Sequence, residues 1–148
     1  MRAIRGELCV RAKTGAGAWA LLLDFGTLAP PDHRGYRQPE KGLVVECPWR
    51  IETRSAVIVA SADAHVTDDA GRRVQMEGLI EGKIQICVGK RIARVSVYRP
   101  SFMACVQFTD DLKLWLFPED SADYEIVSED PRCSWYVAGS AVPSGWEE

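Results

Sequence analysis

The sequence lacks the features that define several large classes of protein. It has two histidines among 148 residues and contains no G-x-S-x-G nucleophile motif, no P-loop and no G-x-G-x-x-G pattern. No segment approaches the ~20 consecutive apolar residues of a membrane span. The N-terminus, MRAIRGELCVRAKTG, is repeatedly interrupted by charge, unlike a signal peptide. We therefore expect a soluble, cytoplasmic protein that has no membrane partner and no cofactor.

Cysteine is present but never in pairs. The five thiols stand singly, with no C-x-x-C spacing and an odd total: Cys9, Cys47, Cys87, Cys105 and Cys133. A disulfide framework favours an even count in a short secreted chain, and a structural zinc site favours closely spaced pairs. We therefore predict reduced, buried thiols and no metal site.

What the sequence does have is short segments of alternating hydrophobicity, separated by turn residues. This period is typical of half-buried strands, and no long segment shows the 3.6-residue period of a helix. The predicted strands cover residues 4–10, 18–25, 43–52, 56–62, 84–88, 93–97, 104–108, 112–116 and 133–138. They predict a mainly β fold, an antiparallel sandwich or barrel-like structure with few or no long helices. The alternative is an α+β fold.

The domain organisation is equally simple. With 148 residues, of which 47% are hydrophobic, the chain suits a single globular domain, residues 1–148. Within it, residues 26–42 contain three prolines and three glycines and predict a long loop. Residues 56–62 are almost entirely apolar, which favours a strand buried on both faces. We expect it to pair with residues 43–52 across a short turn.

The stretch 43-LVVECPWRIE-52 places a cysteine, a proline and a tryptophan side by side. Cys47 and Trp49 fall on its apolar parity, so we predict that both side chains pack in the core. Pro48 has no amide hydrogen to donate to a neighbouring strand. The strand is therefore expected to be an edge, or to be bulged, at that residue.

The net charge is -3, and the negative charge is concentrated near the end of the chain. Residues 110–148 hold ten Asp or Glu against two Lys or Arg, with aromatic side chains interleaved. Buried aromatics supply much of the energy of protein interfaces, and charge steers the encounter. We predict a partner-binding surface made of Trp115, Phe117, Glu119, Asp120, Asp123 and Tyr124. Alternatively, Trp115 and Phe117 are core residues and the acids only keep the protein soluble.

Signals for catalysis are weak. On a strand, Asp63 and His65 would share a face and, with Asp68 and Asp69, could bind a metal or perform acid–base chemistry. A surface turn rich in aspartate is the commoner explanation of this composition. We assign no catalytic residue, and a small hydrolase or metal-dependent enzyme using Asp63 and His65 is the alternative to a binding protein.

A basic face for nucleic acid is the other alternative. It would place Tyr98 as a stacking residue among the cations Arg72, Arg73, Lys90, Arg91, Arg94 and Arg99. The acidic C-terminal quarter and a pI of about 5.5 argue against a nucleic-acid partner.

Four segments together resemble a set of small, uncharacterised bacterial single-domain proteins, chiefly actinobacterial: 23-LDFG-26, 43-LVVECPWRIE-52, 57-VIVASAD-63 and 112-LKLWLFPED-120. The sequence departs from their pattern at 60–61, where Ala-Ser replaces Gly-Ser, and at 110–111, where Asp-Asp lacks the usual turn glycine. The resemblance supports a single domain and transfers no activity.

Small bacterial domains of this style accompany toxin or defence genes as immunity or accessory proteins. By that analogy we expect a non-enzymatic, protein-binding domain of the immunity or accessory type. Its partner would be a basic toxin, a nuclease-like protein or a defence protein, because residues 110–148 are acidic. A homo-oligomer is left open.

Overall fold

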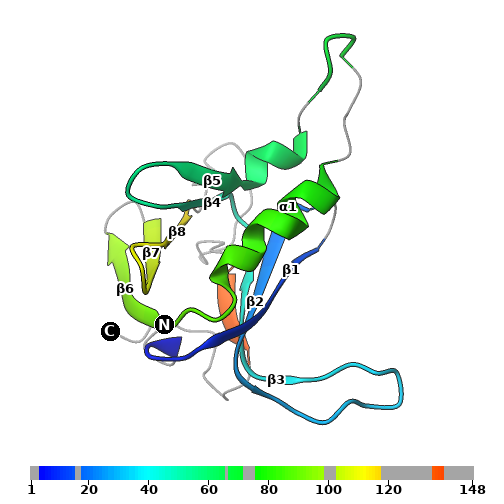
Figure 1. Cartoon of the computed structure of the whole chain (residues 1–148), viewed down its shortest axis with the longest axis vertical. Helices are drawn as coiled ribbons and strands as arrows, with labels where there is room; N and C mark the ends of the chain where they lie inside the picture. The colour runs from blue at the N-terminus through cyan, green and yellow to red at the C-terminus, as the bar shows by residue number, and fades with distance from the viewer. Residues whose placement is uncertain are drawn as a thin grey trace, which may run out of the picture.

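The computed structural model describes residues 4–15, 18–65, 67–71, 76–98, 103–117 and 135–138, and their architecture is mainly β (Figure 1). Two antiparallel sheets have the strand orders β1-β2-β3-β9 and β5-β4-β8-β7-β6. The four-stranded sheet contains β1 (Cys9–Gly15), β2 (Ala20–Leu28), β3 (Pro39–Val45) and β9 (Trp135–Ala138). The five-stranded sheet contains β4 (Trp49–Glu52), β5 (Val57–Ala60), β6 (Ile92–Tyr98), β7 (Met103–Phe108) and β8 (Lys113–Leu116). The predicted fold class is confirmed.

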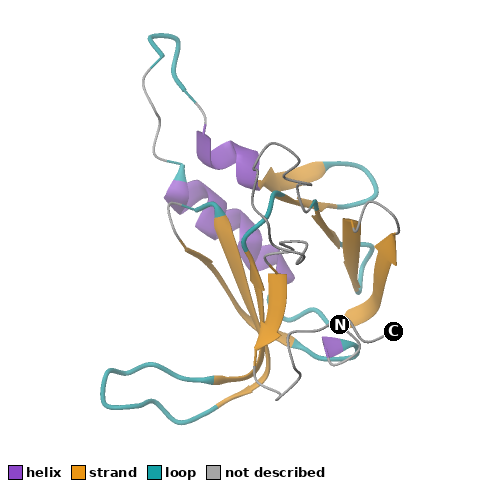
Figure 2. Ribbon diagram, turned by 180° about the vertical axis from the view of Figure 1, so that it is seen from behind, coloured by secondary structure: helices purple, strands orange, loops and turns teal. Residues whose placement is uncertain are grey.

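The described chain also contains one short α-helix and short segments of 3-10 helix. These are α1 (Glu77–Ile84), η2 (Ser61–His65) and η3 (Gln85–Cys87). No helix in the described part of the chain has the length and apolar character needed to cross a membrane. Figure 2 shows the helices beside the sheets and the hairpin between β2 and β3 projecting away from them.

One hydrophobic core lies between the inner faces of the two sheets. The four-stranded sheet contributes Leu21, Leu23, Phe25, Leu43 and Val45, and the five-stranded sheet contributes Trp49, Ile51, Ala104, Val106, Phe108, Leu114 and Leu116. These side chains alternate with more exposed neighbours along each strand, as the sequence predicts. Burying each of the larger ones contributes about 1.5–3 kcal/mol to folding, so this alternation is the main source of the fold's stability.

The outer edge of β1 is covered along its length, which prevents it from pairing with another chain. At its C-terminal half, the backbone N–H and the hydroxyl of Thr14 donate to Glu81 of α1 at 2.8 and 2.6 Å, and the side-chain amide of Gln85 donates to the Ala12 carbonyl at 3.0 Å. At its N-terminal half, residues 6–9 exchange backbone hydrogen bonds with residues 89–92. This second contact links the two sheets at the start of β1 and β6.

The stretch 43–52 is two strands rather than one, which corrects the prediction of a single strand. Leu43 to Val45 end β3 in one sheet, and Trp49 begins β4 in the other. Pro48 lies in the break, where its missing N–H removes no ladder bond, and its carbonyl accepts from the Phe117 N–H at 2.8 Å. Cys47 and Trp49 are 4% and 1% exposed, so their predicted burial is confirmed.

Two other strand predictions are wrong in detail. Residues 84–88 end α1 and form η3, because Ile80, Ile84 and Cys87 bury one helical face instead of alternating. Residues 57–60 form an edge strand, and Val57 is 57% exposed, so this segment is not buried on both faces.

The remaining differences are shifts of boundary. The first strand covers Cys9–Gly15 instead of 4–10, and the loop predicted at 26–42 shortens to residues 29–38 because β2 and β3 extend into it. A bulge between Ile92 and Arg94 puts Ile92 into the core and leaves Ala93 exposed. The predicted final strand is confirmed at 135–138.

The four cysteines in the described chain, Cys9, Cys47, Cys87 and Cys105, are buried thiols, as predicted; Cys133 lies outside the described residues. Burial raises the pKa of Cys9 to about 12, because the thiolate would lose its hydration. Burial likewise raises the pKa of Cys87, with the neighbouring Cys9 adding to the shift.

We predict slow modification of Cys9 and Cys87 in the native protein. A thiol with a pKa near 12 presents almost no thiolate at pH 8, so both sites should react with an aromatic disulfide reagent only as fast as the protein opens. Peptide mapping after timed labelling, with and without urea, measures this. Native rates equal to those in urea would contradict it.

Trp49 provides the sharpest test of the core. Its ring is 1% exposed, and its indole N–H donates to the Trp19 carbonyl at 2.7 Å. We predict that Trp49→Ala lowers the free energy of unfolding by about 3–5 kcal/mol, measured by urea denaturation. Trp49→Phe keeps most of the packing and should lose less, about 1–3 kcal/mol for the unpaired carbonyl. Equal losses in the two variants would show that the ring is not packed.

Candidate binding face on the five-stranded sheet

The outer face of the five-stranded sheet carries the side chains that alternate with the core residues. Register partners point to the same side of a sheet, so two cross-strand rows follow from the pairing. One row contains Arg50, Trp115, Cys105 and Ser96, and the next contains Glu52, Lys113, Gln107 and Arg94. We call this surface the outer face. It includes Trp115 of the predicted site. The buried leucines of β8 point to the opposite side, into the core.

Aromatic contacts organise one end of the outer face. Trp115 reaches across β7 and stacks on Tyr98 of β6, with ring centroids 5.7 Å apart and planes inclined by 29°. Tyr98 is 45% exposed, whereas Trp115 is half-buried. The guanidinium of Arg50 lies 5.4 Å from the centroid of the Phe117 ring, a cation–π distance. An amphipathic, partly exposed surface results, of the kind enriched in protein interfaces.

Glu52 holds this arrangement in place. One carboxylate oxygen accepts the indole N–H of Trp115 at 2.8 Å, and the other lies 2.9 Å from Nε of Arg50. Nε of Arg50 is itself buried and makes no hydrogen bond of good geometry, so its attraction to Glu52 is purely electrostatic. Both carboxylate oxygens are therefore committed, and they hold the side chains of Trp115 and Arg50 in fixed orientations.

Cys105 lies beneath these side chains. It is 6% exposed although it belongs to the outer row, in register with Trp115. Burial raises the pKa of its thiol, and the positive charge of Lys113 partly opposes that shift. The thiol is therefore a small, buried and uncharged side chain in the same cross-strand row as Trp115.

The structure describes two residues of the predicted partner-binding site. Trp115 and Phe117 are both half-buried and lie at the C-terminal end of β8, so neither is a core residue of the kind that Leu114 and Leu116 are. The other predicted members lie outside the described residues: Glu119, Asp120, Asp123 and Tyr124. Trp135 and Tyr136 form part of the β9 backbone.

The alternative site at Asp63 and His65 is not on a strand. Both residues belong to η2, so the predicted shared strand face is wrong. A carboxylate oxygen of Asp63 accepts the Ala60 N–H at 3.0 Å and thereby stabilises the turn that follows β5. Asp68 similarly accepts from Ala70 at 2.9 Å. Among the described residues, no three His, Cys, Asp or Glu side chains gather closely enough to hold a metal.

The predicted basic face is also divided. Lys90 forms an ion pair with Asp110 at 2.7 Å, and Arg91 donates to the Gly6 carbonyl at 3.0 Å, both near the junction of the sheets. Arg94 instead belongs to the outer face, beside Gln107. Three members lie outside the described residues: Arg72, Arg73 and Arg99. No single stripe therefore unites the described cations.

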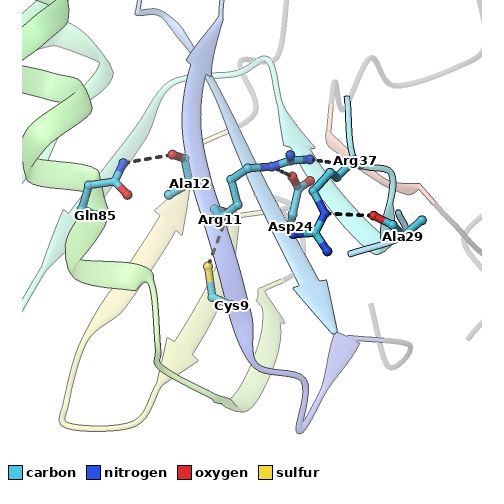
Figure 3. A network of polar contacts seen from close by, with 7 residues as sticks. All are labelled: Cys9, Arg11, Ala12, Asp24, Ala29, Arg37 and Gln85. Atoms are coloured by element: carbon cyan, nitrogen blue, oxygen red, sulfur yellow. Dashed lines mark hydrogen bonds and ion pairs between the residues drawn. The ribbon is translucent and has the colours of Figure 1, made fainter. Parts of the chain in front are cut away.

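A second exposed feature is the hairpin loop 29–38, which Arg11 of β1 secures. Figure 3 shows its guanidinium between Asp24 and the loop: it forms an ion pair with Asp24 and donates to the Arg37 carbonyl at 2.9 Å. Arg37 in turn donates to the Ala29 carbonyl at 3.0 Å. His33 is exposed in this loop, with only its neighbour Arg34 as a described hydrogen-bond partner.

Comparisons with protein-family models, with curated proteins and with solved structures found no match.

The orienting role of Glu52 can be tested directly. We predict that Glu52→Ala frees the Trp115 indole N–H, so that its NMR signal shifts and its exchange with water accelerates. The loss of stability should be small, about 1 kcal/mol, because the pair is partly solvated. Glu46→Ala is the control. It removes an exposed carboxylate in the connection between β3 and β4 and should leave the signal unchanged. An unaltered Trp115 signal in Glu52→Ala would refute the role.

Proposed function

We propose that this chain is a non-enzymatic, protein-binding domain of the immunity or accessory type, and that it engages a basic protein partner. The observation that carries the proposal is the position of Trp115 and Phe117. Both lie on the outer face rather than in the core, half-buried and oriented by Glu52 and Arg50. Side chains held in this way lose little conformational freedom on binding, which favours affinity.

The proposed charge complementarity comes from the sequence that follows. Phe117 is fixed to the body of the domain through its backbone N–H and the Pro48 carbonyl, and the carboxylates of Glu119, Asp120 and Asp123 follow it within six residues. A partner that covers the aromatic end of the outer face would therefore meet a dense source of negative charge. Such charge accelerates the encounter and disfavours acidic competitors.

The nature of the partner follows from this chemistry. A basic toxin, a nuclease-like protein or a protein of a defence assembly would present the necessary Lys and Arg side chains. The aromatic residues supply contact area, so their loss should mainly accelerate dissociation. The acids supply steering, so their loss should mainly slow association.

The test is to isolate the partner with the full chain as bait and to measure association by surface plasmon resonance. We predict a basic partner whose association slows as salt rises, because the Debye length falls from ~10 Å at 0.1 M to ~3 Å at 1 M. Reversing Glu119, Asp120 and Asp123 to lysine should slow association at least tenfold. Trp115→Ala should mainly accelerate dissociation.

The control reverses Glu46 and Asp69, two exposed acids at other places in the described structure, and should change association little. Circular dichroism of each variant verifies folding. A specific partner whose binding responds neither to salt nor to the triple reversal would overturn the basic-partner proposal. Binding that also ignores Trp115→Ala would overturn the choice of face.

A further inference from the structure

A polar depression of about 240 Å³ lies at the opposite end of the outer face from Phe117. Its described lining residues are Arg54 in the turn after β4, Gln107 on β7, Lys113 on β8 and Asp111 in the turn between β7 and β8. Gln107 and Lys113 are register partners, so their side chains leave the sheet together. The volume is below the roughly 300 Å³ at which drug-sized pockets begin, so the depression suits one compact group.

The donors that line this depression are uncommitted. Among the described residues, no hydrogen bond and no ion pair within 4 Å involves the side chain of Arg54, Gln107 or Lys113. Glu52 is the register neighbour of Lys113, but its two oxygens already serve Trp115 and Arg50. The Glu52 carboxylate is therefore already paired with the guanidinium of Arg50 and the indole of Trp115.

The charge balance favours an anion. Arg54 and Lys113 line the depression, and Arg94 follows in the same cross-strand row as the register partner of Gln107. Among the described lining residues, Asp111 is the one carboxylate. With the Glu52–Arg50 ion pair counted as neutral, the described cations Arg54, Lys113 and Arg94 against Asp111 leave a local charge of +2, in a chain whose net charge is -3. A depression with an excess of positive charge raises the local concentration of anions.

We propose that this depression binds a phosphate monoester. Guanidinium, ammonium and amide groups approach from three elements, which matches the several oxygens of a tetrahedral phosphate better than the two oxygens of a carboxylate. A monoester carries a charge of about -2 near pH 8, which balances the site, whereas a nucleic-acid phosphodiester carries only -1. Asp111, an acceptor beside the donors, suits a ligand with a hydroxyl group near its phosphate. This site is separate from the proposed protein partner.

The experiment uses inorganic phosphate and phenyl phosphate as probes, at pH 8 and low ionic strength. We predict saturable shifts in the NMR signals of the Gln107 side-chain amide and the Lys113 backbone. Arg54→Gln and Lys113→Gln should each weaken binding at least tenfold. Lys83→Gln, a control on the exposed side of α1, should have no effect. Thermal unfolding of each variant verifies that the fold is retained.

Asp111→Asn gives the most specific readout. Asp111 has a φ of +58°, a conformation that Asn also tolerates, so the turn should survive. Removing its negative charge should strengthen the binding of inorganic phosphate severalfold, an effect that general damage to the site would not produce.

Three outcomes would overturn the proposal. Citrate binding as tightly as phosphate would identify a carboxylate site, and an oligonucleotide without terminal phosphates binding more tightly would identify a nucleic-acid surface. Equal losses of phosphate binding in Lys83→Gln and Lys113→Gln would show that the anion is attracted by the general positive charge of the surface and not by this depression.

Discussion

The passage of the chain from one sheet to the other, at residues 46–48, is the constraint on which the rest of the structure depends. Pro48 cannot donate to a ladder, so β3 ends before it and β4 begins after it. Trp49 then fixes the geometry of the crossing. Its backbone N–H donates to the buried Ser61 hydroxyl at 3.1 Å and its indole N–H to the Trp19 carbonyl at 2.7 Å. One residue thus joins β4, the end of β5 and the start of β2.

This crossing also decides which side chains face outwards. With Trp49 and Ile51 directed into the core, Arg50 and Glu52 must point to the opposite side of β4. They meet Trp115 and Phe117 there through the ion pair, the hydrogen bond and the cation–π contact. The outer face therefore has an aromatic end, where protein binding is proposed, and a cationic end, where phosphate binding is proposed. Glu52 separates the two because both of its oxygens serve the aromatic end.

Alternation alone predicted the parts of the fold that depend on neighbouring residues. The hairpins built from β6, β7 and β8 follow from it, and Asp110 adopts positive φ in the last turn without a glycine. It failed at Ile84, where an alternating triplet concealed the helical spacing of Ile80, Ile84 and Cys87. The depression could not be predicted, because its lining depends on which residues of β4, β7 and β8 lie opposite one another. The pairings on either side, β4–β5 and β6–β7, each contain a bulge that alternation does not reveal.

The central claim is that Trp115 and Tyr98 form a solvent-accessible face, whereas Trp49 belongs to the core. Hydroxyl-radical footprinting of the native protein, read by mass spectrometry, measures this difference in one experiment. The account predicts ready oxidation of Tyr98, intermediate oxidation of Trp115 and strong protection of Trp49, in keeping with their exposed fractions. Protection of Trp115 and Tyr98 equal to that of Trp49 would contradict the account, because the outer face would then not be open to a partner.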